Sequence, residues 1–423
     1  MLSYPEALAL VLDHASPLPA EDRPLAEAVG YVLAADLTAA TASPGFDNSA
    51  MDGFAVRAAD TERAEPTRPA RLVVRAVLAA GDIRTAAPLA TGDAAEIMTG
   101  APVPPGADTI IPVEQIKRDG AAILIDAPSA PGRNIRRRGS DFAAETLLLP
   151  RGTPITPTAL PLLAASGCAA FRLHPPPRVW WISTGRELVD TPGSPLAPGQ
   201  IYNSSGPYGA AAVAAAGAVL LGRATVGDDG DGFRRAMTAA LASTANVVIS
   251  TGAVSVGAYD FVRAALEAMG ADILLHRVRV KPGKPILFAR LPDGRFFFGL
   301  PGNPASTAMG FRMIVVPFLR ALAGHGPERP LIARLCGGDV TASPNLTVFL
   351  KAVLSERDGR LVASPLDGQE SYKVSSMALM NAWIVHPEGV DTLADGQDVA
   401  CYPLLPGMLS PVGRTSRRYS PRS

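Results

Sequence analysis

The sequence predicts a multidomain α/β protein whose central domain is built on a mainly parallel sheet. Three observations support this fold class. The chain has 423 residues, which is too long for one ordinary hydrophobic core. Apolar runs alternate with helical segments between about residues 177 and 326. Short β-rich runs, broken by Gly and Pro, occupy much of the chain on either side of that region.

The N-terminal part begins with a short amphipathic helix and continues as β structure. Residues 4–13 carry Leu8, Val11 and Leu12 on one side of a predicted helix. Between about residues 44 and 145, β-rich runs are interrupted repeatedly by Gly and Pro, which favours a small β domain. The clearest of these runs cover residues 72–78, 110–113 and 122–125.

The central part begins after Pro175-Pro176-Pro177, a sequence typical of a domain boundary. Strands and helices are predicted to alternate beyond it, which indicates βαβ units and a mainly parallel sheet. The predicted strands cover residues 179–183, 219–226, 247–250 and 296–300, and the predicted helices cover residues 205–216, 231–242 and 260–269.

A second boundary begins at His325-Gly326-Pro327, and the chain beyond it is predicted to form a β-barrel or a β-sandwich. Its short predicted strands cover residues 331–335, 348–354, 382–385 and 399–402. The Arg- and Ser-rich end, residues 414–423, is predicted to be a disordered tail.

The composition excludes several classes of protein. Lys plus Arg and Asp plus Glu number 39 each, so no global field would attract nucleic acid or an anionic membrane. The three cysteines lie far apart and form neither a disulfide framework nor a metal-spaced pair, which favours a reducing compartment. The N-terminus lacks the basic region of a signal peptide, and no apolar run is long enough to span a bilayer. We therefore expect a cytoplasmic protein.

Three predicted strands end in turns that suit an anionic ligand. These turns are Ser183-Thr184-Gly185, Ser250-Thr251-Gly252 and Pro301-Gly302-Asn303-Pro304. Ligands of open parallel sheets bind beyond the carboxyl ends of the strands, and free N–H groups at helix starts favour anions. Any one of the turns could be an ordinary strand-to-helix connection, but three in one sheet favour a binding site.

Two basic segments are candidate anion ligands. Lys281 and Lys284 flank a stiff Pro-Gly turn, so both ammonium groups could face one oxyanion. Arg136-Arg137-Arg138 could form forked contacts to phosphate. A solvated turn and a solvated loop are the alternatives.

Acidic residues near these turns are candidates for holding a cation. One set contains Asp228, Asp229 and Asp260, and the other contains Asp47, Asp52 and Asp141. Mg²⁺ typically takes one or two carboxylates together with phosphate oxygens. The alternative for Asp228 is a helix N-cap, and the alternative for Asp47 is a local Asx-turn. The sequence contains no histidine ligand spacing and no Ser/His/Asp arrangement that would indicate a hydrolase.

Six segments in order resemble the molybdopterin molybdenumtransferase family, whose animal relatives include the E domain of gephyrin. Any one segment could occur by chance, whereas all six in this order indicate the family. They are residues 46–56 (FDNSAMDGFAV), 97–108 (IMTGAPVPPGAD), 134–139 (NIRRRG) with Asp141, 254–257 (VSVG) with Asp260, 281–285 (KPGKP) and 300–304 (LPGNP).

The resemblance implies an architecture of four domains. An N-terminal domain in two parts, residues 1–44 and 143–176, would carry an inserted β-rich domain at residues 45–142. An α/β molybdopterin-binding domain at residues 177–326 and a C-terminal β-barrel at residues 327–413 would follow. The family is also expected to form homodimers, in which the α/β domain of one subunit and the inserted domain of the other enclose each active site.

The implied reaction converts adenylyl-molybdopterin and molybdate to molybdenum cofactor with release of AMP, and it requires Mg²⁺. Molybdopterin adenylyltransferase and apo-molybdoenzymes are implied as partner proteins. The implied residues fall into five groups: pterin and phosphate binding by Ser183, Thr184, Gly185, Ser250 and Gly252; metal binding or water positioning by Asp228, Asp260 and Glu187; molybdate binding by Lys281, Lys284, Pro301, Gly302, Asn303 and Pro304; substrate binding by Ser255 and Ser371; and closure from the partner subunit by Asp52, Thr99, Arg136 and Asp141.

The sequence also departs from the family pattern, and several departures remove negative charge. They are Ala253 in place of Gly, Ser140 in place of Glu, Asn203 in place of Asp, Arg186 in place of an acid, and Lys351 in place of an Arg linked to molybdate. A catalytically impaired paralogue that only binds pterin or a partner protein is therefore the second hypothesis. An adenylyl-transferring relative is the third, and the N-terminal motifs argue against it.

Overall fold

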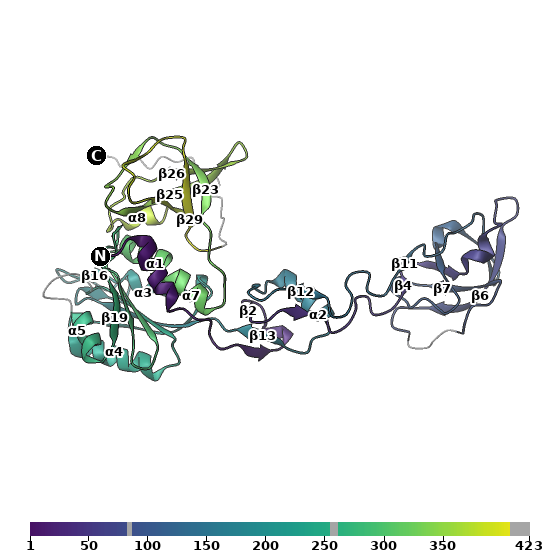
Figure 1. Cartoon of the computed structure of the whole chain (residues 1–423), viewed down its shortest axis with the longest axis horizontal. Coiled ribbons are helices and arrows are strands. Elements are labelled where there is room, and N and C mark those ends of the chain that lie inside the picture. The colour runs from purple at the N-terminus through teal and green to yellow at the C-terminus, as the bar shows by residue number, and fades with distance from the viewer. Residues whose placement is uncertain (83–86, 254–260, 407–423) are drawn as a thin grey trace. The chain divides into compact units, whose positions relative to one another are not determined.

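The computed structural model describes residues 1–82, 87–253 and 261–406, and the chain forms two compact units (Figure 1). The large unit contains Met1–Glu21, Gly30–Ala34 and Leu173–Ser423. The small unit contains Asp22–Val29 and Ala35–Arg172. The predicted tail at residues 414–423 and the predicted start of a helix at residue 260 lie outside the described residues.

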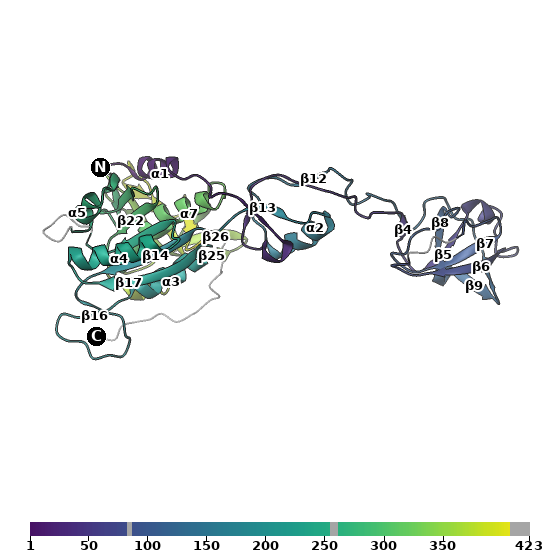
Figure 2. The ribbon, with the colours of Figure 1, turned by 90° about the horizontal axis from the view of Figure 1, so that it is seen from below.

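The small unit contains a six-stranded sheet, whose strands lie side by side in Figure 2. Its order is β8-β5-β7-β6-β10-β9. The strands are β5 (Gly53–Val56), β6 (Ala70–Leu78), β7 (Asp93–Ile97), β8 (Thr109–Pro112), β9 (Ile116–Asp119) and β10 (Ala122–Ile125). The three strands predicted in this region are confirmed as β6, β8 and β10.

An apolar cluster lies on each face of this sheet, because successive side chains of a strand point to opposite faces. In β5, Phe54 and Val56 belong to one apolar cluster, while Ala55 belongs to the cluster on the opposite face. All four residues of β5 are buried. The short apolar run that the family motif contains is therefore a core strand of the small unit.

Shorter elements of the small unit lie on both sides of the sheet in sequence. Strand β3 (Leu37–Thr38) precedes it and pairs with β12 (Leu147–Leu149), which follows it. The chain segments that precede and follow this sheet in sequence thus pair with each other. The remaining short elements are β4 (Asn48–Ser49), β11 (Ile135–Arg136), α2 (Leu160–Ala165) and the 3-10 helices η1 (Leu25–Glu27), η2 (Ala58–Thr61), η3 (Val113–Gln115) and η4 (Pro157–Ala159). A separate three-stranded sheet has the order β1 (Glu21–Arg23), β13 (Phe171–His174) and β2 (Val32–Leu33).

A second six-stranded sheet forms the α/β part of the large unit, in the order β17-β14-β18-β22-β21-β19. The first four strands in this order run parallel, and the last two are antiparallel to their neighbours. The strands are β14 (Arg178–Thr184), β17 (Val219–Val226), β18 (Val247–Thr251), β19 (Asp272–His276), β21 (Leu287–Arg290) and β22 (Phe296–Leu300). The mainly parallel sheet is confirmed. Strands β19 and β21 are additional, and the alternation of strands and helices in the sequence did not predict them.

Helices cover both faces of this sheet (Figure 2). Successive strand residues point to opposite faces: Trp181 packs in the cluster with α3, and Ile182 packs in the cluster with α4 and α5. The helices are α1 (Tyr4–Asp13), α3 (Ser205–Ala215), α4 (Gly230–Ala242) and α5 (Phe261–Ala268). The predicted N-terminal helix is confirmed as α1, and its Ser3–Glu6 capping box satisfies the first N–H groups.

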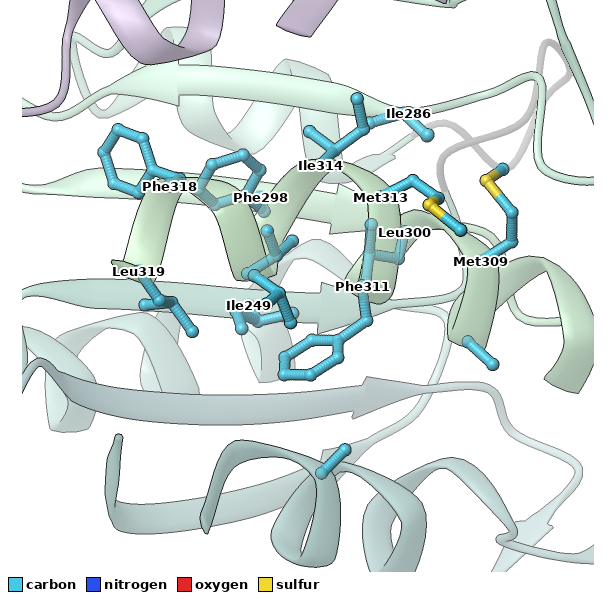
Figure 3. Close-up of a cluster of buried hydrophobic side chains, with 14 of the residues drawn as sticks. Ile249, Ile286, Phe298, Leu300, Met309, Phe311, Met313, Ile314, Phe318 and Leu319 are labelled. Carbon is cyan, nitrogen blue, oxygen red and sulfur yellow. The ribbon is translucent and has the colours of Figure 1, made fainter. Parts of the chain in front are cut away.

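A long helical stretch after β22 was not predicted from the sequence. It contains α6 (Pro304–Gly310), a π-helical turn η5 (Phe311–Val315) and α7 (Val316–Leu322). The stretch is long and apolar enough to cross a membrane, but it is 83% buried inside the large unit. In Figure 3, Phe311, Phe318 and Leu319 lie beside Ile249 and Phe298 of the sheet. It is therefore the central core helix of this unit.

The C-terminal strands form a closed five-stranded barrel. Of the two predicted alternatives, the β-barrel is therefore confirmed and the β-sandwich is wrong. The strands follow the order β25-β26-β23-β29-β27, and β27 pairs back onto β25. Closure leaves these strands without an open edge. The barrel strands are β23 (Leu331–Leu335), β25 (Thr347–Arg357), β26 (Arg360–Pro365), β27 (Ala382–His386) and β29 (Asp398–Pro403), with β20 (Val280–Lys281) added beside β25. The short elements of this unit are α8 (Val374–Met377) and the pairs β24 (Val340–Thr341) with β28 (Thr392–Leu393) and β15 (Leu188–Val189) with β16 (Ile201–Tyr202).

Candidate active site

The three predicted strand-end turns of the large unit lie together. Strands β14, β18 and β22 are neighbours, with Ser183 opposite Thr251 and Thr251 opposite Leu300. The Thr184 hydroxyl donates to the Thr251 carbonyl at 3.0 Å. The Gly252 N–H donates to the Leu300 carbonyl at 3.0 Å. The structure therefore assembles these turns at one edge of the sheet, where open α/β sheets bind ligands.

Glycine is required where two of these turns approach each other. Gly252 has a φ of 91°, and a Cβ atom there would lie 2.4 Å from the Thr184 carbonyl oxygen. A Cβ atom on Gly302 would lie 3.4 Å from the Gly252 Cα atom, so the two backbones are adjacent. The edge of the sheet is consequently formed by main-chain atoms, which suits the close approach of a ligand.

A cavity of about 770 Å³ opens beside these turns. This size falls in the range of small-molecule and cofactor sites. The predicted residues that line it are Thr184, Glu187, Asp228, Gly252, Pro301, Gly302, Asn303 and Pro304. Sequence reasoning missed several other lining residues, among them Tyr202, Gly283, Pro285, Tyr372 and Val374. Gly283 and Pro285 belong to the KPGKP motif, so the motif itself was the available signal for these two.

Two buried hydroxyl groups lie at the ends of β14 and β18. Ser183 is 1% exposed and Ser250 is fully buried, and neither hydroxyl has a hydrogen-bond partner in the described parts of the chain. A buried polar group without a partner costs about 1–3 kcal/mol. Neither serine lines the cavity, so the proposed contact of Ser183 and Ser250 with substrate remains a prediction.

Asp228 and Asp229 have different roles, although they are adjacent. Asp229 is the N-cap of α4, and its carboxylate accepts from the Gly232 N–H at 2.5 Å. Helix capping by Asp228, the plainer alternative, is therefore wrong. Asp228 lines the cavity, and one of its oxygens accepts from the Arg186 N–H at 3.4 Å.

The described residues contain no group of three or more His, Cys, Asp or Glu side chains that could enclose a metal ion. Asp228 and Glu187 both line the cavity and supply carboxylate oxygens, the donors that Mg²⁺ prefers. Two carboxylates fit a cation that also takes oxygen atoms from a bound phosphate. Asp260 and Ser255 lie outside the described residues.

The two lysines of the KPGKP motif do not line the cavity, although the turn between them does. Both Lys281 and Lys284 are exposed, whereas Gly283 is buried against α6. A Cβ atom on Gly283 would lie 3.3 Å from the Ser306 carbonyl oxygen. The turn is thus fixed by packing, and the contact of both ammonium groups with molybdate remains a prediction.

Ser371 joins the site from the C-terminal part of the large unit. Its hydroxyl accepts from the Asn303 side-chain amide at 3.1 Å, and its carbonyl accepts from the Ala305 N–H at 3.0 Å. The predicted residues Ser371 and Asn303 are therefore in direct contact. This contact attaches the segment that carries Tyr372 to the first turn of α6.

Two departures from the family pattern have physical consequences. Ala253 has a φ of 50°, a left-handed conformation that is strained for residues with a side chain. Asn203 donates from its amide to Asp190 at 2.8 Å and accepts from the Gly206 N–H at 3.0 Å. An aspartate at position 203 would have no proton to donate to Asp190. The asparagine therefore suits its acidic neighbour, which sequence reasoning missed.

The N-terminal motifs come together separately in the small unit, where they form a group that we call the small-unit cluster (residues 46–52, 97–101 and 134–141). The strands β4 and β11 pair, with Asn48 opposite Arg136. Asp52 accepts from the N–H and the hydroxyl of Thr99, both at 2.7 Å, and these bonds hold the pKa of Asp52 below its usual value. Arg136 donates to the Ala50 carbonyl at 3.3 Å. Asp52, Thr99, Arg136 and Asp141 are all exposed.

Asp47 connects two segments of the small-unit cluster that lie far apart in sequence. Its carboxylate accepts from the Arg138 N–H at 2.8 Å and from the Arg137 guanidinium at 2.6 Å, and these contacts lower its pKa. The plainer alternative of a local Asx-turn is therefore wrong. The Arg137 side chain is likewise not simply solvated, because it is paired with Asp47.

Comparison with known proteins places these features in one family. Three family models match in order: "MoeA N-terminal region (domain I and II)" over residues 2–167, "Probable molybdopterin binding domain" over residues 180–321, and "MoeA C-terminal region (domain IV)" over residues 335–404. The molybdopterin molybdenumtransferase of Synechococcus elongatus is 36% identical over 402 residues, which cover 94% of this chain and 98% of that protein. Molybdopterin molybdenumtransferase 2 of Mycobacterium tuberculosis is 38% identical over 389 residues, which cover 90% of this chain and 94% of that protein.

A solved structure agrees with these sequence relatives. The crystal structure of the molybdopterin biosynthesis MoeA protein from Pyrococcus horikosii matches with a TM-score of 0.81 and 31% sequence identity. The match covers 96% of this chain and 99% of that one. The family resemblance of the six sequence motifs is thereby confirmed along nearly the whole chain. The chain belongs to the molybdopterin molybdenumtransferase (MoeA) family of molybdenum cofactor biosynthesis.

Proposed function

We propose that this chain inserts molybdenum from molybdate into adenylyl-molybdopterin and releases AMP, as the final step of molybdenum cofactor synthesis. The observation that carries the proposal is the assembly of three strand-end turns, Asp228 and Glu187 around one cavity of about 770 Å³. The main-chain edge at Gly252 and Gly302 accepts a closely approaching ligand. The two carboxylates supply oxygen ligands for a cation that neutralises phosphate charge.

Each group of residues has a role in this proposal. The turns at residues 183–185 and 250–252, with Ser255, bind pterin and phosphate groups. Lys281 and Lys284, together with the turn at residues 301–304 and Ser371, attract molybdate, which is a dianion. Cleavage of the phosphoanhydride then depends on positioning and on charge neutralisation.

Asp228, Glu187 and Asp260 would hold Mg²⁺ next to the phosphate groups of the substrate. The ion would supply positive charge to the phosphate oxygens when bound. The role of the protein residues is to orient the phosphoanhydride and to keep an attacking oxygen in line with it. Asp260→Asn keeps the shape of the side chain and removes its charge, so we expect it to bind substrate and release little AMP, with partial recovery at high Mg²⁺.

The direct test measures AMP release from adenylyl-molybdopterin by the purified chain, with and without molybdate. We expect AMP release that depends on molybdate and on Mg²⁺. Binding of adenylyl-molybdopterin without any AMP release would overturn the transferase proposal. That result would support the alternative, a catalytically impaired pterin-binding paralogue, which the strained Ala253 and the other departures favour.

We further propose that the active enzyme is a homodimer and that the small-unit cluster of the partner subunit completes each site. The exposure of Asp52, Thr99, Arg136 and Asp141 supports this role, because these polar motif residues are not used in a core. A mixture of an Asp52→Ala chain and an Asp228→Asn chain, each with reduced AMP release, should be more active than either variant alone, since a mixed dimer keeps one intact site. Mixtures that stay inactive although the chains exchange would exclude a shared site.

We also propose that the reaction takes place in the cytoplasm. Even charge balance and three separated cysteines support reaction in the cytoplasm. The proteins that would deliver the substrate and receive the product are a molybdopterin adenylyltransferase and apo-molybdoenzymes. The charge balance gives no support to a nucleic-acid or membrane partner.

A further inference from the structure

Lys351 lies in the wall of the C-terminal barrel, on β25, and it is only 1% exposed. Lysine is almost never fully buried unless its charge is satisfied. No carboxylate contacts its ammonium group among the described residues. The neighbouring acid, Glu370, is paired instead with Lys373 at 2.9 Å. The buried charge of Lys351 therefore requires another source of stabilisation.

The ammonium group of Lys351 is surrounded by acceptors from one chain segment, residues 368–376. It donates to the carbonyl oxygens of Gly368 at 2.5 Å and Glu370 at 3.1 Å, and to the Ser376 hydroxyl at 2.7 Å. The Lys373 carbonyl lies at 3.5 Å. A lysine ammonium has three protons, so these contacts use all of them.

The main chain of Lys351 also forms hydrogen bonds with this segment. The Gln369 side chain accepts from the Lys351 N–H at 2.9 Å and donates to the Lys351 carbonyl at 2.9 Å. Ser376 donates in turn to the Gly368 carbonyl at 2.8 Å. Residues 368–376 therefore form a loop that is folded around one buried cation.

This loop is also the segment that reaches the cavity. Ser371 contacts Asn303 and the Ala305 N–H at the start of α6. Tyr372 and Val374 line the cavity, although both side chains are largely exposed. Lys351 is thus connected to the turn at residues 301–304 through its hydrogen bond to Glu370, the adjoining residue Ser371 and the hydrogen bond of Ser371 with Asn303.

We propose that Lys351 is a positioning residue for the molybdate end of this site: its buried ammonium holds the loop of residues 368–376, and therefore Ser371 and Tyr372, against Asn303. The proposal rests on the proposed transferase function. It also assigns Lys351 a role other than direct contact with the anion. All three protons are engaged, and the surrounding carbonyl oxygens would repel a dianion.

The test compares Lys351→Met with Lys373→Met. The first change leaves three buried acceptors without their cation, whereas the second removes a partly exposed ammonium from the same loop and leaves Lys351 in place. We expect Lys351→Met to raise the KM for molybdate roughly ten- to a hundredfold, the effect of displacing site residues by about 1 Å. The kcat at saturating molybdate should fall less. Lys351→Arg, which keeps the charge, should restore part of the affinity, and Lys373→Met should resemble the parent chain.

Hydrogen exchange of residues 366–377 supplies a readout that needs no reaction. Lys351→Met should speed exchange in this loop, while exchange in the barrel strands stays slow. Ser376→Ala removes one acceptor and should produce a smaller change in the same direction, so it serves if Lys351→Met fails to fold. Unchanged exchange in both variants would overturn the positioning role. Faster exchange with an unchanged KM for molybdate would also overturn it, because the loop would then not serve this site.

A failure of the proposed transferase function can be distinguished from a failure of the positioning role of Lys351. A parent chain that releases no AMP with molybdate contradicts the proposed function, whatever Lys351 does. In that case the hydrogen exchange experiment, together with binding of molybdate alone measured by calorimetry, still decides whether Lys351 holds the loop and whether the loop affects anion binding.

Discussion

The strand-end turns of the large unit and the small-unit cluster are held by different kinds of interaction. At the turns, main-chain atoms meet at Gly252 and Gly302, and the Asp228 carboxylate lines a cavity. In the small-unit cluster, polar and charged side chains bond to each other, as Asp47 does with Arg137 and Asp52 does with Thr99. We therefore expect the first region to be sensitive to added atoms, and the second to be sensitive to charge and pH.

The largest effect is expected from Gly252→Ala. The new Cβ atom would lie 2.4 Å from a carbonyl oxygen, and the φ of 91° adds strain. The turn must move, so AMP release should fall about a hundredfold or more, as expected for a displacement near 1 Å. The unfolding free energy should fall by about 1–3 kcal/mol. Enzyme kinetics and denaturant titration measure the two changes.

Gly217→Ala is the matched control for this change. Gly217 has a similar φ of 77°, but a Cβ atom added there would meet no neighbouring atom within 4 Å. We expect a loss of about 1–2 kcal/mol from backbone strain alone, with normal AMP release. Equal activity losses in the two variants would mean that the close contact at Gly252 does not shape the site.

The next largest effect is expected from Asp228→Asn compared with Asp229→Asn. The first change removes a charge that lines the cavity, so AMP release should fall roughly ten- to a hundredfold and should need more Mg²⁺. The second change should be nearly silent, because Asn and Asp are equally good N-caps. Titration of Mg²⁺ against rate separates them. A larger loss in the Asp229 variant would reverse the roles that the structure gives these neighbours.

A smaller effect, in pH dependence, should separate the two units. In the large unit, burial and the nearby Arg320 charge lower the pKa of His325 to about 4. The unfolded chain, with a histidine pKa of about 6.5, binds more protons between these values. The unfolding free energy of this unit should therefore fall as the pH drops from about 6.5 to 4. His325→Leu should flatten that dependence.

The small unit should respond in a lower pH window. The pKa values of Asp47 and Asp52 are lowered by hydrogen bonds from Arg138 and Thr99. Their contribution is complete above the unfolded value, about 4, and is lost as the pH falls through the lowered values. Calorimetry across pH should show the large unit losing stability first. The opposite order, or one transition that shifts as a whole, would contradict this assignment.

The smallest effect is expected from Ala253→Gly. A residue with φ of 50° is strained unless it is glycine. We expect a gain of about 0.5–1 kcal/mol in unfolding free energy, after the greater entropy of unfolded glycine is taken into account. Ala240→Gly inside helix α4 should instead lose stability, by about 0.5–1 kcal/mol or more. Thermal denaturation of both variants tests the opposite signs, and a loss in both would remove the strain argument.

Local sequence was sufficient for many elements of the fold. Strands β10, β17, β22 and β23 were predicted with the bounds that the structure has, because each is an apolar or β-branched run between turn residues. The three strand-end turns were recognisable for the same reason. The order of strands in an open parallel sheet then brings such turns to one edge.

The central core helix was not predicted, because apolar and polar residues do not alternate in its sequence with the helical period. Residues 304–322 are apolar on nearly all sides and are 83% buried, so no polar face marks the helical period. Closure of the barrel could not be predicted from the sequence either. It depends on the pairing of β25 with β27, whose residues are distant in sequence.

The site shows the same division between sequence and tertiary structure. The motifs supply residue types that suit a phosphate and a cation, since glycine turns, lysines and carboxylates have that chemistry wherever they lie. Tertiary structure decided that Asp229 caps a helix while its neighbour Asp228 lines the cavity. It also decided that Lys351 is buried among carbonyl oxygens. Burial and hydrogen-bond partners come from chain segments that only folding brings together, and they determine what a charged side chain can do.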